Sequence, residues 1–146
     1  MPTAERTATT NWEGDLAHGN GTLSFASGAA GDLPVTWASR TERSEGRTSP
    51  EELVAAAHAS CFAMALSHGL TEAGHRPESL AVSATVTLDM DAGPKVTSSA
   101  ISVEGRVPGI EEAQFKEAAD AAGTGCPIGG ALQGNVEITV DAKLVA

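Results

Sequence analysis

The stretch SPEELVAAAHASCFAMALS, residues 49–67, decides the fold of this 146-residue chain. Ser49 suits the N-cap of a helix, Pro50 suits its first turn, and the two glutamates that follow suit the positive end of the helix dipole. The helix is predicted to run to about Ala73 and to stop at Gly74. Its middle is apolar nearly all round, so we expect a buried central helix, and its many alanines indicate close approach to another backbone.

The segments on either side of this helix predict β-structure. Residues 8–39 hold short apolar stretches between turns, with a hairpin turn expected at residues 18–21. Beyond the helix, apolar and polar residues alternate strictly over residues 80–90, which is typical of a half-buried strand. A turn at residues 91–94 then leads into a return strand over residues 95–107.

The last part of the chain predicts two more helices and a strand. Residues 110–122 form a helix that ends at Gly123, a second helix starts at Cys126, and residues 136–144 alternate as a final strand. No repeat or linker divides the chain. The pattern therefore predicts one α+β domain over residues 1–146, in which antiparallel sheet packs on the central helix.

Composition argues against several classes of protein. The formal charge of −10 repels phosphate backbones and anionic lipid heads, and aromatic residues make up only 3%, so neither nucleic-acid nor membrane binding is expected. No apolar run predicts a membrane span, and no apolar signal region opens the chain. We therefore expect a cytoplasmic protein. In that reducing compartment a cysteine pair is more often catalytic, redox-sensing or idle than a lasting disulfide.

Cys61 and Cys126 are the only thiols. Cys61 lies in the middle of an apolar helix, where burial raises the pKa of a thiol and leaves it inert. Cys126 is expected to be the N-cap before Pro127, where the helix dipole favours a thiolate. Local chemistry therefore predicts Cys126 as the reactive thiol, and Cys61 would need a cation for activation. Candidate cations lie in the polar loop expected over residues 40–50, although composition favours a solvated role for each of them: Arg40, Arg43 and Arg47.

A metal site is the next alternative. His58 and Cys61 are three residues apart on the predicted helix, a spacing that allows two ligands to share a metal. The chain has only four histidines and no CxxC pair, so we expect no metal. His58 is predicted to be a polar residue of the core or of an interface.

Three stretches together make the chain resemble a known family. They are WEGDLAHGNGTLS at residues 12–24, the central-helix stretch at residues 49–67, and GTGCPIGGAL at residues 123–132. They are similar to the osmotically inducible protein C (OsmC) branch of the OsmC/Ohr peroxidase superfamily, over nearly the whole chain. The resemblance implies antiparallel sheets wrapped around a buried central helix that carries Cys61, in an interlocked homodimer.

The resemblance also implies a thiol peroxidase without haem, metal or flavin. In the family, the cysteine that matches Cys61 attacks the peroxide and the one that matches Cys126 resolves the product, which reverses the ranking from local chemistry. The activating residues match Glu51 and Arg40. One extra residue between that arginine and Pro50 leaves Arg43 as an alternative.

The implied substrate is an organic hydroperoxide, which an apolar pocket involving Phe62 and Met64 would favour. The implied reductant is an external dithiol, and the family points to dihydrolipoyl proteins. Two alternatives to a peroxidase stay open. The first is a non-enzymatic redox-responsive or ligand-binding module on the same fold. The second is a structural protein whose thiols take no part in its function.

Helix geometry adds one expectation. Glu51 and Cys61 are ten residues apart, which is roughly 15 Å along a straight helix. One arginine cannot easily reach both within a single chain. An antiparallel pair of central helices would bring Glu51 of one subunit near Cys61 of the other, so we expect a two-fold homodimer with shared sites.

Overall fold

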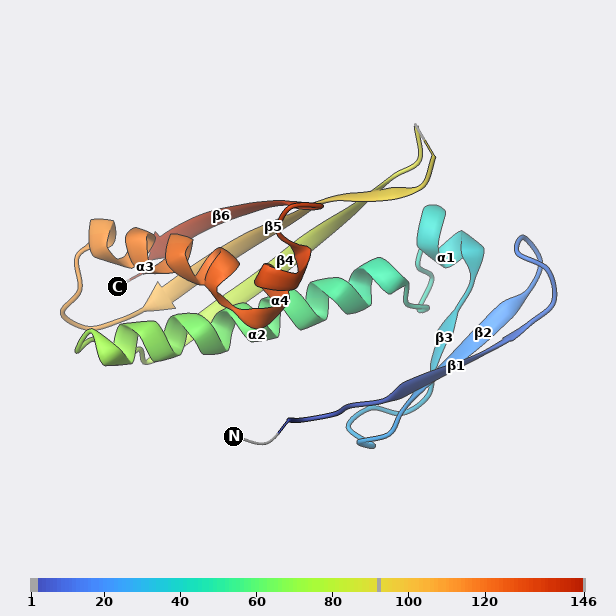
Figure 1. Cartoon of the computed structure of the whole chain (residues 1–146), viewed down its shortest axis with the longest axis horizontal. Coiled ribbons are helices and arrows are strands. Elements are labelled where there is room, and N and C mark those ends of the chain that lie inside the picture. Colours follow the sequence, from blue (N-terminus) through green and yellow to red (C-terminus); the bar gives the residue numbers. More distant parts are fainter. Residues whose placement is uncertain (1–2, 92, 146) are drawn as a thin grey trace. The chain divides into compact units, whose positions relative to one another are not determined.

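The computed structural model describes residues 3–91 and 93–145 (Figure 1). The chain divides into two compact units, Met1–Pro50 and Glu51–Ala146. Each unit holds one three-stranded sheet, and helices accompany both sheets. The α+β class predicted from the sequence is therefore confirmed.

The N-terminal unit is an antiparallel sheet in the order β1-β2-β3, followed by one short helix. Its elements are β1 (Ala8–Glu13), β2 (Asn20–Phe25), β3 (Leu33–Val35) and α1 (Trp37–Thr41). The hairpin turn lies earlier than predicted, because Asn20 and Gly21 already pair with Glu13 and Trp12 in the ladder. Glycine and asparagine mark a turn only when the strand register leaves them unpaired, and here they are paired.

The predicted loop over residues 40–50 begins later than expected. Thr36 caps α1 through a reciprocal pair of hydrogen bonds with Ser39. This capping box starts a short helix where the polar composition had predicted none. Arg40 therefore lies in the last turn of a helix, and the loop starts after Thr41.

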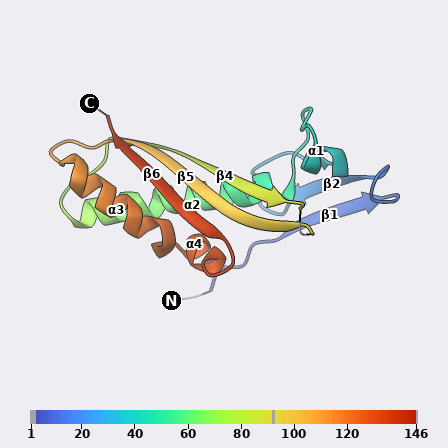
Figure 2. The ribbon, with the colours of Figure 1, turned by 90° about the horizontal axis from the view of Figure 1, so that it is seen from above.

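The C-terminal unit packs helices on one face of a second sheet (Figure 2). Its elements are α2 (Pro50–Glu72), β4 (Ser79–Asp89), β5 (Lys95–Arg106), α3 (Glu112–Gly125), α4 (Pro127–Leu132) and β6 (Glu137–Leu144). The sheet order is β4-β5-β6, with β4 and β5 antiparallel. α3 runs two residues beyond its predicted end, because Gly123 lets the helix lie against Val140, whose Cγ2 would be 2.8 Å from an added Cβ.

The prediction of purely antiparallel sheet is wrong at one edge. β6 pairs with β5 in parallel, with Ser98 opposite Glu137 and Gly105 opposite Leu144. The connection through α3 and α4 carries the chain back to the starting end of β5, and a crossover of this kind is what a parallel pair requires.

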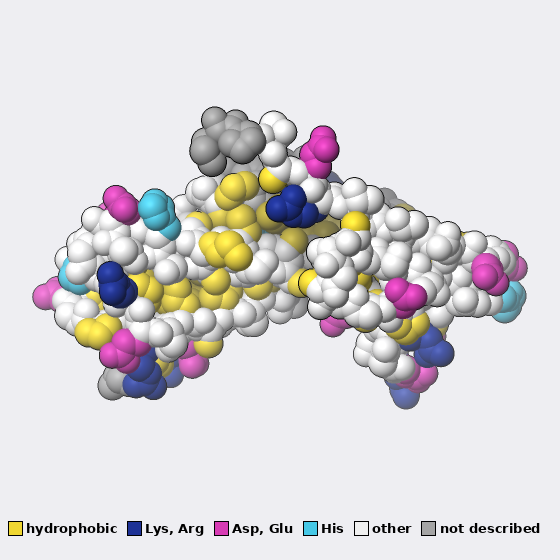
Figure 3. All heavy atoms as spheres, turned by 90° about the horizontal axis from the view of Figure 1, so that it is seen from below, with side chains coloured by type: hydrophobic (Ala, Val, Ile, Leu, Met, Phe, Trp, Pro, Cys, Tyr) yellow, Lys and Arg dark blue, Asp and Glu magenta, His cyan; other side chains and the backbone are white. Residues whose placement is uncertain are grey.

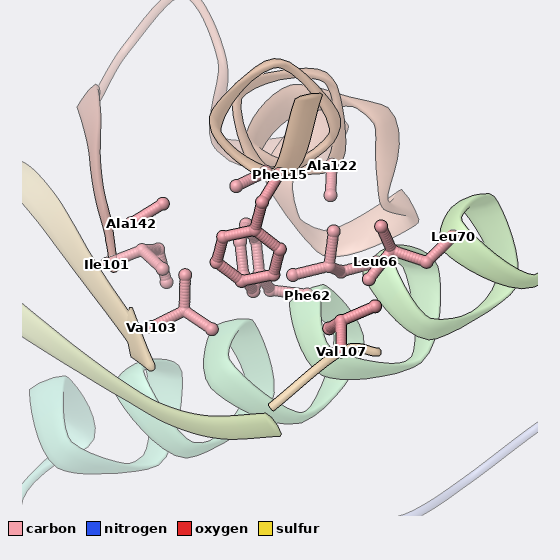
Figure 4. Packing of buried hydrophobic residues seen from close by; sticks show 10 residues of the cluster. Phe62, Leu66, Leu70, Ile101, Val103, Val107, Phe115, Ala122 and Ala142 are labelled. Carbon is pink, nitrogen blue, oxygen red and sulfur yellow. The ribbon is translucent and has the colours of Figure 1, made fainter. Parts of the chain in front are cut away.

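The core of this unit lies between the sheet and the two long helices (Figure 4). Phe62 from α2 and Phe115 from α3 are both fully buried, and they meet aliphatic side chains from β5. The cluster comprises Phe62, Leu66, Leu70, Ile101, Val103, Val107, Phe115, Ala119, Ala122 and Ala142. It fixes the face of α2 that points at the sheet, and with it the direction of every other side chain on that helix.

The sequence predicted that α2 is buried on all sides, but in the single chain only one side of the helix is buried. Its buried positions follow one stripe, and Met64 on another face is 74% exposed. Hydrophobic side chains consequently gather on the exposed surface over this helix (Figure 3). Among the described residues only α2 has the length and composition of a membrane span, with a mean hydropathy of 1.4, a test that the core helix of a soluble protein also passes.

Candidate functional site

The two cysteines, far apart in sequence, meet where α2 passes the junction of α3 and α4. Cys61 lies in the middle of α2 and is half-buried, whereas Cys126 is 1% exposed. Both are free thiols, and the Cys61 side chain hydrogen-bonds to Cys126. The structure therefore brings together the two sulfurs that the sequence singled out.

The first turn of α4 contacts both sulfurs. Cys126 is the N-cap of α4 with Pro127 at the first helical position, as predicted. The Gly129 N–H donates to Cys126 Sγ at 3.3 Å, and the Ile128 N–H donates to Cys61 Sγ at 3.5 Å. Consecutive backbone amides thus hold the two thiols on one side of a short helix.

Gly129 is required for this arrangement. A Cβ added there would lie 2.2 Å from the Gly123 carbonyl oxygen and 3.2 Å from Cys126 Sγ. Because the first of these neighbours is backbone, it cannot move aside as a flexible side chain would. Any larger residue would push α4 away from the end of α3 and away from the sulfur.

The prediction that the helix dipole makes Cys126 the activated thiol is wrong. Burial raises the pKa of the Cys126 thiol, and the hydrogen bond and charge interaction with Cys61 raise it further. The Gly129 N–H lowers it, but by less than burial raises it. Cys126 is therefore held as a neutral thiol near neutral pH.

This raised pKa predicts how disulfide formation depends on pH. A thiolate is the attacking species, and its fraction grows about tenfold per pH unit below the pKa of the thiol. Since the pKa of Cys126 lies above the ordinary 9.0, the rate of Cys61–Cys126 bond formation is expected to rise about tenfold between pH 7 and pH 8. Stopped-flow measurement after one equivalent of hydroperoxide checks this, and a rate that is flat over this range would contradict it.

Glu51 and Arg40 lie on different elements. Glu51 is 8% exposed in the first turn of α2, on the same continuous helix as Cys61. Arg40 is half-buried at the end of α1, with its guanidinium 5.9 Å from the centre of the Trp37 ring. Arg40 belongs to the N-terminal unit, so the structure does not place it relative to Cys61. Arg43 is exposed in the following loop.

His58 is a core residue, as the sequence predicted. It is 0% exposed, and its two ring nitrogens lie 2.6 Å from Ser99 Oγ and 3.4 Å from the Gly123 carbonyl oxygen. No sequence signal pointed to Ser99, and Gly123 was predicted only as the end of a helix. The described residues contain no group of three histidine, cysteine or acidic side chains able to hold a metal.

The prediction that Phe62 helps to line an apolar substrate pocket is wrong. Phe62 is fully buried in the core, so it cannot line an open pocket. Met64 faces an open hollow along α2 together with four of its helix neighbours. The hollow is lined by Ala63, Met64, Ser67, His68 and Thr71.

Comparisons with known proteins agree with this architecture. A family model described as OsmC-like protein matches residues 43–141. The chain is 44% identical over 135 residues to Peroxiredoxin OsmC of Escherichia coli (strain K12), and the alignment covers 92% of each protein. It is 29% identical over 97 residues to the organic hydroperoxide resistance protein of Xanthomonas axonopodis pv. citri (strain 306), covering 64% of this chain and 65% of that protein.

A solved structure has the same fold. The organic hydroperoxide resistance protein OhrB of Bacillus subtilis superposes with a TM-score of 0.74 over 94% of this chain and 98% of its own. The two sequences are 26% identical. The similarity spans both compact units, so the fold is shared over nearly the full length of both proteins.

Proposed function

Because the chain belongs to the OsmC-like protein family, we propose that it reduces organic hydroperoxides to alcohols with Cys61 and Cys126 as its redox pair. Relatives named peroxiredoxin and organic hydroperoxide resistance protein support a peroxidase, an oxidoreductase with a role in stress defence. One observation carries the proposal: two free thiols lie within hydrogen-bonding reach of each other, and only one of them is open to a substrate.

That difference in exposure assigns the roles. A hydroperoxide can reach the half-buried Cys61, so Cys61 is the thiol that attacks it. Cys126 is closed off and neutral, which protects it from the peroxide until the neighbouring sulfur has been oxidised. The Ile128 N–H donates a hydrogen bond to Cys61 Sγ at 3.5 Å and so holds that sulfur beside the first turn of α4.

The cycle then has three steps. The Cys61 thiolate attacks the outer peroxide oxygen, the O–O bond breaks, and the alkoxide leaves and takes up a proton as the alcohol. The Cys126 thiolate attacks Sγ of the Cys61 sulfenic acid, an S–S bond forms, and hydroxide leaves and becomes water. An external dithiol reduces the disulfide by exchange.

Sulfur carries both electrons in this cycle, so peroxidases of this type work without a prosthetic group. A dihydrolipoyl protein fits as the reductant, because its two thiols can complete the exchange without a second molecule. The need for a reduced dithiol supports a reducing compartment such as the cytoplasm for this reaction.

Arg40 and Glu51 are proposed to activate Cys61. An arginine beside the sulfur stabilises the thiolate through its charge and its fixed N–H donors. The buried Glu51 would orient that arginine by a two-pronged ion pair. Both residues are partly or largely shielded from water, whereas the alternative, Arg43, is exposed. Shielding strengthens the interaction, so Arg40 is the better candidate.

The second copy of this chain is the proposed partner of the exposed face of α2. Small or apolar residues recur there every fourth position, at Ala56, Ser60 and Met64, and small residues let two helix backbones approach closely. Glu51 and Cys61 lie roughly 15 Å apart along one helix. An antiparallel partner helix would therefore bring its own first turn, which carries Glu51, to the level of Cys61 on the first helix. The site is then shared between two subunits.

Placing a charge on this face is expected to weaken the dimer. Met64→Glu would bury a carboxylate against the partner helix, and the dissociation constant should rise about tenfold or more. Light scattering over a dilution series measures it, starting from a wild type at twice the 14.7 kDa mass of the chain. The matched control is Ala121→Glu, at an exposed position of α3, which should stay dimeric. A wild type that is monomeric and fully active would refute the shared site.

The substrate is proposed to be an alkyl or lipid hydroperoxide. Met64 lies three residues after Cys61, so both side chains are on neighbouring parts of one helix face, and an apolar tail would bind beside Cys61 where this face meets the partner helix. An apolar tail gains contact there that hydrogen peroxide cannot make.

Peroxide consumption tests the proposal against the alternative of a non-enzymatic redox or ligand-binding module. Wild-type protein with cumene hydroperoxide and dithiothreitol should consume many equivalents of peroxide per chain and release cumyl alcohol. A module would react once at most. Stoichiometric consumption with every dithiol tried, including dihydrolipoamide, would therefore favour the module.

A further inference from the structure

His58 is a fully buried polar side chain that the cycle above does not use. It lies on α2 three residues before Cys61, so the two side chains point toward neighbouring parts of the same surface. Its ring joins three elements, since Ser99 belongs to β5 and Gly123 to the last turn of α3. A buried histidine with both nitrogens engaged fixes the positions of those elements relative to one another.

The carbonyl that His58 contacts has lost its normal helical partner. In an α-helix the carbonyl of residue 123 accepts from the N–H of residue 127. Residue 127 is proline, which has no N–H, and the last backbone bond of α3 is the 3.3 Å bond from Cys126 N to the Ala122 carbonyl. Gly123 is buried, so its carbonyl needs another donor, and His58 Nε2 lies 3.4 Å away.

This requirement also sets the proton on the ring. A carbonyl oxygen only accepts, so Nε2 carries the hydrogen and Nδ1 accepts from the Ser99 hydroxyl at 2.6 Å. Ser99 is fully buried as well, and its hydroxyl holds the ring in the orientation that donates to Gly123.

The Gly123 carbonyl is directly connected to the second sulfur. Gly123 stands three residues before Cys126, and Gly129 packs so closely on its carbonyl that no Cβ fits between them. The N–H of Gly129 in turn donates to Cys126 Sγ. A shift of this carbonyl would therefore move Cys126 through the chain and through α4 at the same time.

We propose that His58 is a positioning residue for the second step, which holds the end of α3 so that Cys126 stays against Cys61. This rests on the proposed peroxidase cycle. The Cys61 sulfenic acid has two fates. Cys126 attacks its sulfur and releases water, or a second hydroperoxide transfers an oxygen atom to it, giving sulfinic acid and one more alcohol. His58 favours the first fate by keeping the attacking sulfur in place.

The test compares His58→Leu with His58→Gln. Leucine fills a similar volume without a donor, whereas the glutamine amide still carries an N–H donor. Each protein is cycled with cumene hydroperoxide and dithiothreitol, and intact-mass spectrometry measures the sulfinic acid formed per alcohol released. The ratio is expected to rise about threefold to tenfold in His58→Leu, the effect of one neutral hydrogen bond, and glutamine is expected to restore most of it.

Ser99→Ala provides a second variant if leucine impairs folding. It keeps the imidazole and removes only the hydroxyl that fixes the tautomer, so a smaller rise in the same ratio is expected. A folded His58→Leu or Ser99→Ala protein with the wild-type ratio would overturn the inference, as would a glutamine variant no better than leucine. Failure of the peroxidase proposal looks different, because wild-type protein would then form neither the sulfenic acid nor the disulfide.

Discussion

Replacing Cys61 by serine is expected to abolish peroxide reduction, with a fall of about four orders of magnitude or more in the second-order rate constant. A serine hydroxyl is not ionised near neutral pH and cannot pass through the sulfenic acid and disulfide stages. The smaller side chain fits a half-buried position on α2, so the loss would be chemical and not structural. Consumption of cumene hydroperoxide with dithiothreitol measures it.

Cys126→Ser is the matched control for this result. Without reductant it should still release about one alcohol per chain, because Cys61 and its contacts from Ile128 remain. The sulfenic acid would then persist or go on to sulfinic acid, which mass spectrometry distinguishes from the wild-type disulfide. The role assignment is wrong if Cys126→Ser loses the first turnover while Cys61→Ser keeps it.

The second large effect is expected at Arg40. Arg40→Met keeps an apolar side chain of similar reach over Trp37 and removes the charge, so the N-terminal unit should stay folded. Loss of a preorganised donor at a reacting atom typically lowers a rate about 100- to 1000-fold, and the first-step rate constant is expected to fall by that amount. Stopped-flow oxidation of the reduced protein measures this constant separately from the later steps.

Arg43→Met is the comparison that makes the Arg40 result informative. Arg43 is exposed, and its removal should change the same constant less than about twofold. Equal losses in the two variants would mean that net charge, and not one positioned guanidinium, is responsible. A large loss confined to Arg43→Met would move the activating role to that residue.

Local signals predicted much of the fold because they depend on near neighbours. The serine, proline and two glutamates at residues 49–52 predicted the start of α2, which begins at Pro50. The alternation over residues 80–90 predicted β4, whose bounds are Ser79–Asp89. Helix caps and apolar–polar alternation depend on residues within one turn or one strand, so they can be recognised in the sequence without knowledge of the tertiary structure.

Other features depended on distant partners, and the sequence could not predict them. Alternation has the same period in parallel and antiparallel strands, so it did not show that β6 runs parallel to β5. The apolar residues on all sides of α2 did not show which of them are buried within the chain and which are exposed. Cys126 looked activated because its helix cap is local, whereas the burial that raises its pKa comes from packing.

The parallel pairing of β5 and β6 also determines when the site comes into existence. Ile128 and Cys61 are 67 residues apart in the chain, and they meet only when the crossover through α3 and α4 has docked. Contacts of such long range form late in folding, after the entropy of closing a large loop has been overcome. On the ribosome Cys61 therefore emerges as a single thiol with no partner. The proposed redox couple is therefore complete only in the folded chain, and an incompletely folded chain is expected to be oxidised without turning over.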